Sequence, residues 1–145
     1  MTQEDKQLLV VDLCSRLPYG VKVLCLRNFN RDWYNLEMVD IGDNEVYLTA
    51  VEPYTNRYAE IETIKPYLFP ISSMTDEQRK EFLNIQSEER KTLLDDMVKY
   101  RYEKEDKIPI IPTQKHIDFF HKNHIDYREL IPKGLAIDAT GLNIY

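Results

Sequence analysis

Glycine is scarce in this chain, and its scarcity excludes the phosphate-binding loops. Only four glycines occur among 145 residues. They are too scattered for a GxGxxG motif or a P-loop, in which several backbone amides must approach one phosphate group. The two cysteines, Cys14 and Cys25, have no CxxC spacing, and we interpret them as reduced core residues. The sequence therefore predicts no nucleotide loop, no disulfide and no cofactor.

Long hydrophobic runs are also absent. The longest apolar run near the start, Leu8 to Val11, is far shorter than the roughly 20 residues that span a bilayer and is wrongly flanked for a signal peptide. We therefore expect a cytoplasmic protein that does not bind a membrane. Ser72 and Ser73 lack a GxSxG elbow, and no other nucleophile has a base beside it in the sequence. These absences favour a protein that is not an enzyme, and they leave a metal-dependent enzyme open as the alternative.

Positive charge is the third deficit. The formal net charge is -6, and no dense run of Lys and Arg offsets it. The overall field does not favour the phosphate backbone, so we expect no nucleic-acid partner. Acidic residues gathered on one face could instead mimic a nucleic acid, although solubility alone accounts for a charge of this size.

What the chain does contain is a helix followed by strands. Thr2 and Asp5 have capping-box spacing, and leucines at three- and four-residue steps give one apolar stripe that Pro18 ends. Alternating apolar residues then predict three strands joined by turns into an antiparallel meander. In the second strand, Tyr34, Leu36 and Met38 are expected on one face. The leucines of the stripe are Leu9, Leu13 and Leu17. The three predicted strands are residues 21–26, 33–41 and 45–51.

The second half is predicted to be mainly helical. Pro66 and Pro70 favour an extended edge segment over residues 64–71, and Thr75 with Gln78 caps a helix that begins at about Asp76. Residues 76–104 fit one bent helix or two helices equally well. Thr113 is a cap for a further helix, Asp126 with Glu129 caps a turn, and residues 135–137 form a small strand. We predict one α+β domain over 1–145, with helix and sheet in 1–71 and helices packed against them in 72–145.

The three histidines lie close together in the sequence, which suggests a metal site. His116 and His121 differ by five positions and diverge by about 140° on a regular helix, so they cannot chelate together. A set of His121, His124 and Asp126 stays open as a site for a metal-dependent hydrolase or nuclease. The competing interpretation is that these histidines lie on the surface or cap a helix end.

Tyrosine is unusually frequent, with ten residues. The polar loop that holds Tyr54, Arg57 and Tyr58 is the candidate partner-binding site, because Tyr and Arg anchor many protein interfaces. The competing interpretation is that these are ordinary half-buried tyrosines.

Three stretches of the chain carry a resemblance, which covers about a quarter of its length. They are RLPYGVKV at Arg16 to Val23, IKPYLFPISSMTDEQ at Ile64 to Gln78, and HIDYRELIPKGLAI at His124 to Ile137. In this order they resemble short uncharacterised proteins of bacterial genomes and of their prophages and phages. The resemblance implies a small cytoplasmic accessory protein and brings no known activity or site.

Three functions follow from these observations. The leading expectation is a non-enzymatic module of a phage or prophage that binds a protein partner. The alternatives are the metal-dependent hydrolase or nuclease and the acidic nucleic-acid mimic. The sequence does not predict the identity of the partner or the oligomeric state.

Overall fold

Helix α1 (Gln3–Arg16) begins at the predicted capping box. The computed structural model describes residues 1–27, 33–43, 45–49, 57–90 and 113–145. Asp5 donates its backbone N–H to the Thr2 hydroxyl at 3.1 Å, and the Thr2 N–H bonds the Asp5 carboxylate at 3.3 Å. A 3-10 turn (Leu17–Tyr19) follows, and Gly20 ends it with a φ of 71°, a conformation that costs glycine little. The predicted helix and both of its ends are confirmed.

The sheet has six strands, not the three of the predicted meander. The order is β4-β3-β2-β1-β5-β6, and only the β5–β6 pair is parallel. The meander is present as β1, β2 and β3, but long-range pairing extends it on both sides. The α+β class is confirmed, and the three-stranded sheet is wrong. The strands are β1 (Lys22–Cys25), β2 (Tyr34–Asp40), β3 (Glu45–Thr49), β4 (Arg57–Glu60), β5 (Ile64–Leu68) and β6 (Ile137–Asp138).

Strand β5 was predicted at an edge and lies instead between β1 and β6. Its proline is tolerated because of the register. Pro66 stands opposite Val23, whereas the neighbouring bond from Leu26 N–H to Thr63 C=O marks the alternate positions as the hydrogen-bonded ones. Pro66 therefore turns its nitrogen away from β1, and β6 joins only from Tyr67 onward.

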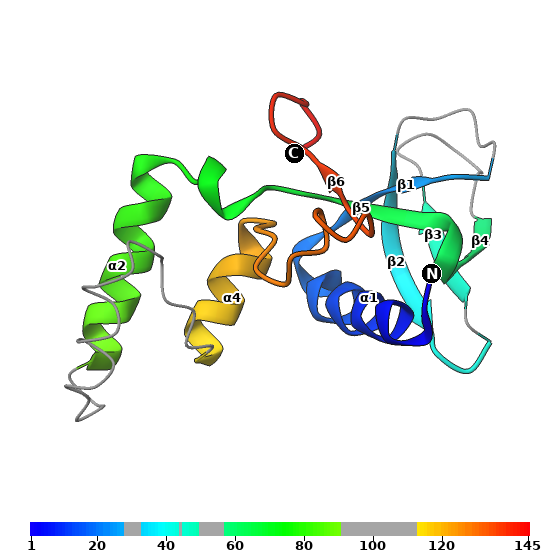
Figure 1. The fold of residues 1–145 in the computed structure, drawn as a ribbon, viewed down its shortest axis with the longest axis horizontal. Helices are drawn as coiled ribbons and strands as arrows, with labels where there is room; N and C mark the ends of the chain where they lie inside the picture. The colour runs from blue at the N-terminus through cyan, green and yellow to red at the C-terminus, as the bar shows by residue number, and fades with distance from the viewer. Residues whose placement is uncertain (28–32, 44, 50–56, 91–112) are drawn as a thin grey trace.

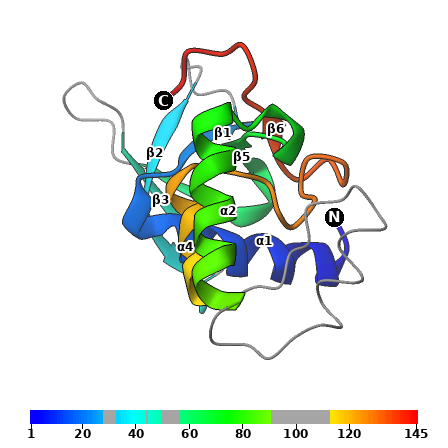
Figure 2. The same cartoon turned by 90° about the vertical axis from the view of Figure 1, so that its left-hand side faces the viewer.

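The helices of the second half lie to one side of the sheet (Figure 1). Helix α2 (Asp76–Arg90) begins with the predicted reciprocal bonds between Thr75 and Gln78, at 2.9 and 3.2 Å. It continues through Ser87 without a break, and residues 91–112 lie outside the described part. Helix α4 (Gln114–Lys122) begins at the predicted Thr113 cap. Figure 2 shows α2 in front of α4 with the sheet behind them.

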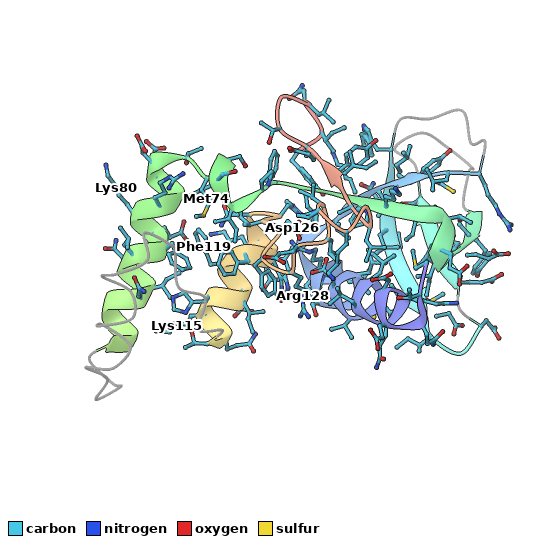
Figure 3. All side chains as sticks on the ribbon, viewed as in Figure 1. Met74, Lys80, Lys115, Phe119, Asp126 and Arg128 are labelled. Carbon is cyan, nitrogen blue, oxygen red and sulfur yellow. The ribbon has the colours of Figure 1, made fainter. Side chains whose placement is uncertain are left out.

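The buried apolar residues of the described ranges form three clusters. The largest joins Leu9 and Leu13 of α1 to the inner side chains of the sheet, among them Val23, Leu36 and Leu48. A second cluster is aromatic and packs α2 against α4, with Phe119 between the two helices in Figure 3. The third surrounds Leu68 and Leu130. No helix in the described ranges is long and apolar enough to cross a membrane.

Candidate functional site

The side of β2, β3 and β4 that faces away from α1 carries apolar side chains in contact with solvent. We call it the outer face; it lies opposite the buried Val46, Leu48 and Ala59. Tyr58 is 60% exposed and Met38 is 43% exposed, and both pair with Tyr47 in the register of the sheet. The rings of Tyr47 and Tyr58 are 5.1 Å apart, so they form one aromatic surface. The outer face consists of Glu37, Met38, Asp40, Glu45, Tyr47, Thr49, Tyr58 and Glu60.

Met38 reaches the outer face because of a bulge in β2. The register shifts between Leu36 and Met38, so that Leu36 pairs with Leu48 whereas Met38 pairs with Tyr47. The extra residue turns Met38 to solvent and returns Val39 to the core side. The prediction that Tyr34, Leu36 and Met38 share one face is therefore wrong for Met38.

Strand β4 is the last strand at its end of the sheet. Among the described strands, none pairs with its far side, and an unpaired edge is the kind of position where a partner strand can be added. Of the predicted partner-binding residues, Tyr54 lies outside the described residues. Arg57 is the first residue of β4, and its side chain lies outside the described part of the structure. Tyr58 is exposed on the outer face, but it belongs to a strand and not to a loop.

The charged groups of the outer face are acidic. The Glu37 carboxylate accepts a bond from the Thr49 hydroxyl at 2.9 Å, and Glu60 pairs with Arg27 at 2.8 Å. Asp40 accepts from the backbone of the turn that follows it, at 2.9 and 3.2 Å. Glu45 has no ion pair among the described residues. The aromatic surface is thus bordered by carboxylates, an arrangement that attracts Lys and Arg side chains.

The three histidines are buried, which contradicts the expectation of surface or capping residues. His116 packs on Phe82, with 4.9 Å between ring centres, and its Nδ1 lies 2.7 Å from the Thr113 hydroxyl. Burial is the main reason that the pKa values of His121 and His124 fall to about 4, and the positive charge of Arg16 adds to the effect. Both rings are therefore neutral at pH 7.

The proposed metal ligands do not converge. His121 Nε2 lies 3.1 Å from the Tyr127 hydroxyl, whereas the His124 ring stacks on Tyr145 with centres 3.8 Å apart. The two Asp126 oxygens each accept a backbone N–H at 2.8 Å, from Leu130 and Ile131. In the described ranges no three His, Cys, Asp or Glu side chains are grouped to hold a metal ion. Asp126 acts as the predicted cap of the turn that contains Leu130.

A buried polar network joins α1 to the segment after α4, and the sequence reasoning missed it. Arg16 is fully buried and makes two bonds to Asp12, at 2.7 and 3.2 Å. It also donates to the carbonyls of Phe120 and Ile125, at 3.5 and 2.8 Å. Arg128 lies 3.4 Å from Asp12, so it attaches this segment to the same carboxylate.

The network extends to the histidines. Arg128 Nε donates to the Tyr127 hydroxyl at 2.8 Å, and that oxygen also meets His121. The sequence contained a signal for this arrangement. Leu9, Asp12, Leu13 and Arg16 follow the i, i+3, i+4, i+7 pattern of a buried stripe, and Asp12 and Arg16 have ion-pair spacing. These groups hold one another in place, and none is a nucleophile beside a base.

Comparisons with known proteins add no identification. No protein-family model, no curated protein and no solved structure matches this chain.

Proposed function

We propose that this chain is a non-enzymatic, cytoplasmic interaction module that binds a protein partner through the outer face. The observation that supports the proposal is Tyr58, 60% exposed on the last strand of the sheet and packed on Tyr47. An accessory protein of a phage or prophage, as the resemblance suggests, is the context that we propose for it.

The outer face combines features that binding surfaces use. Tyrosine supplies broad apolar contact with a polar end, and methionine adapts its shape to a partner. Strand β4 offers backbone groups for strand addition, while Tyr58 and Glu60 would contact alternate side chains of the added strand. The bordering carboxylates favour a partner segment that is extended and carries Lys or Arg.

The acidic mimic remains open as a second candidate because of one observation. Glu37, Asp40, Glu45 and Glu60 lie on the same face of the sheet. If the chain acts as a mimic, its partner is a nucleic-acid-binding protein, and DNA or RNA competes with the outer face for it.

The test compares three tagged forms of the protein in extracts of the cells that encode it. Wild type and Val11→Ala, an exposed apolar residue on α1 (43% exposed), should retain the same partner. Tyr58→Ala should lose that partner by at least about tenfold, which corresponds to roughly 1.4 kcal/mol. Circular dichroism establishes that all three forms are equally folded.

The bound fraction should also fall as salt is raised, because the bordering carboxylates contribute electrostatic attraction. A partner that Tyr58→Ala and wild type capture equally would show that the outer face is not the binding site. Capture of no protein by any form would contradict the proposed function itself.

A further inference from the structure

The pairing of β1 with β5 stops before the last possible pair of residues, and the Tyr145 side chain bridges the two strands at that position. The pairs Val23–Pro66 and Leu24–Lys65 place Lys22 opposite Tyr67 as the next hydrogen-bonded pair. The register of β1 with β5 stops at the Val23–Pro66 pair, and the Lys22 N–H has a side-chain acceptor. It donates to the Tyr145 hydroxyl at 3.1 Å, and that hydroxyl donates to the Tyr67 carbonyl at 2.8 Å.

The phenol ring of Tyr145 is held on several sides. It stacks on His124, with centres 3.8 Å apart and an angle of 13° between the planes, and it contacts Phe69 at 5.9 Å. The Lys22 ammonium lies 5.6 Å from the ring centre and is also bonded to the Ile144 carbonyl. We call this enclosure the phenol slot, formed by Lys22, Tyr67, Phe69 and His124.

The phenol slot is built by the rest of the fold. The Phe69 N–H donates to the His124 carbonyl at 2.9 Å, and the Asp126 N–H donates to the Phe69 carbonyl at 2.8 Å, so His124 is fixed on β5 by its backbone. Its φ of 54° is unusual for a residue other than glycine. Its Nδ1 is buried without a hydrogen-bond partner among the described residues, and the residue as a whole is only 8% exposed.

The phenol hydroxyl matches the slot chemically. It must accept from an N–H and donate to a carbonyl at the same time, which a hydroxyl can do and a benzene ring cannot. Tyr145 as a whole is 41% exposed, but its hydroxyl is enclosed between two main-chain groups. This burial raises the pKa of Tyr145 to about 12, so the hydroxyl keeps the proton that it donates at neutral pH.

The segment that carries Tyr145 is attached by few contacts. Leu142 is 46% exposed, and Gly141 before it has a φ of 77°, a conformation that a glycine hinge adopts without strain. The Ala139 N–H donates to the Leu68 carbonyl at 2.8 Å. The Thr140 and Leu142 N–H groups bond the nearby Asp138 carboxylate and Ala139 carbonyl. Among the described residues, the bonds from 140–145 to distant parts of the chain come from Ile144 and Tyr145. Release of residues 140–145 would therefore open the slot and leave the sheet in place.

We propose that the phenol slot is a binding site for a tyrosine side chain or another para-alkylated phenol, which Tyr145 occupies as an internal ligand. When residues 140–145 are released, a phenol from outside the chain takes the same position. The site is separate from the outer face, and the proposal does not depend on the proposed function.

The test removes the internal ligand and supplies its side chain in solution. Tyr145→Ala leaves the slot empty, and p-cresol has the shape and hydroxyl of the missing group. At a concentration of about ten times its Kd, p-cresol should raise the Tm of Tyr145→Ala by roughly 4 °C. Toluene at the same concentration should raise it by less than half as much, since it cannot bridge Lys22 and Tyr67.

Two controls establish that the effect belongs to the slot. Wild type should not respond, because its own phenol is present at a high effective concentration. Tyr58→Ala lacks an exposed tyrosine elsewhere on the sheet and should not respond either. If Tyr145→Ala is unfolded alone, p-cresol should restore its far-ultraviolet circular dichroism.

A peptide with the sequence of residues 139–145 distinguishes the two sources of a phenol. Tighter binding of the peptide than of p-cresol to Tyr145→Ala indicates a tyrosine within a polypeptide, and equal binding indicates a free phenol; both support the slot. If neither ligand stabilises or refolds Tyr145→Ala, or if toluene acts as well as p-cresol, the proposal is wrong.

Discussion

Arg16 shows how this fold accommodates a charge without any contact with water. Burying an arginine costs several kcal/mol unless its donors are satisfied. Here the guanidinium bonds the Asp12 carboxylate, the Phe120 carbonyl in the last turn of α4 and the Ile125 carbonyl after it. Together with the contact between Arg128 and Asp12, these bonds of Arg16 attach α1 to α4 and to the segment after it.

Removal of Asp12 should destabilise the protein strongly. Asp12→Ala leaves Arg16 buried without its counter-charge, and we expect the free energy of unfolding to fall by about 3 to 5 kcal/mol. The double variant Asp12→Ala/Arg16→Met should regain part of this loss, because no unpaired charge remains. Guanidinium denaturation measures all three.

The surface pair of Lys6 and Glu62 is the matched control. Its separation is 2.8 Å, close to the 2.7 Å of the buried pair, but both side chains contact water. Glu62→Ala should hardly move the denaturation midpoint, since solvent screens exposed pairs. If Asp12→Ala costs no more than Glu62→Ala, the buried pair does not hold α1 and the segment after α4 together.

The bulge in β2 gives two apolar residues of this strand different exposures to solvent. Leu36 is 3% exposed in the core, whereas Met38 is 43% exposed on the outer face. Leu36→Ala should cost about 2 to 5 kcal/mol, and Met38→Ala should change the stability by no more than about 0.5 kcal/mol. Thermal and denaturant unfolding measure both. Equal losses would mean that β2 has no bulge and that the simple alternation of the sequence is correct.

Element ends could be predicted from the sequence, and strand order could not. Thr2 with Asp5 and Thr75 with Gln78 act within one helical turn, so their spacing alone was sufficient. The positions of β4, β5 and β6 depend on pairing across long stretches of chain. Pro66 indicated an edge by its chemistry, yet only the register explains why it is tolerated between β1 and β6.

Only part of the candidate site could be predicted, because the rest of it also depends on contacts between distant parts of the chain. Tyr58 stands out in the sequence as one of several tyrosines near an arginine, but its exposure follows from the position of β4 at the end of the sheet. His116 and His121 lie in α4 and are covered by α2 and by the segment after α4, and a helix pattern alone does not indicate these tertiary contacts. Tyr145 reaches β1 across 123 positions, which no local pattern indicates.

Two buried histidines lie where the two halves of the chain meet. His121 lies near Arg16, Asp12, Arg128 and Asp118, and His124 near Arg16 and Lys22. Cationic neighbours and burial both oppose protonation of these rings. The junction between α1 and the segment after α4 therefore favours the neutral form of both histidines.

This arrangement predicts a loss of stability in mild acid. Unfolded histidine titrates near pH 6.5 and the folded rings near pH 4, so between these values the unfolded chain binds protons that the folded chain does not. The stability present above pH 6.5 should fall progressively as the pH approaches 4, by up to about 3 kcal/mol for each ring. Burial raises the pKa of Asp126, so this carboxyl takes up its proton more readily in the folded protein than in the unfolded chain. Its protonation therefore offsets a small part of the loss of stability as the pH falls.

Denaturation midpoints measured from pH 7.5 to pH 4 test this prediction, with His124→Phe as the informative variant. Phenylalanine can keep the stacking on Tyr145 but cannot take a proton. Strain at the positive φ of position 124 lowers its stability by the same amount at every pH, so the slope against pH is the quantity to compare. His124→Phe should lose about half of the wild-type slope, and an unchanged slope would show that His124 titrates as freely in the folded protein as in the unfolded chain.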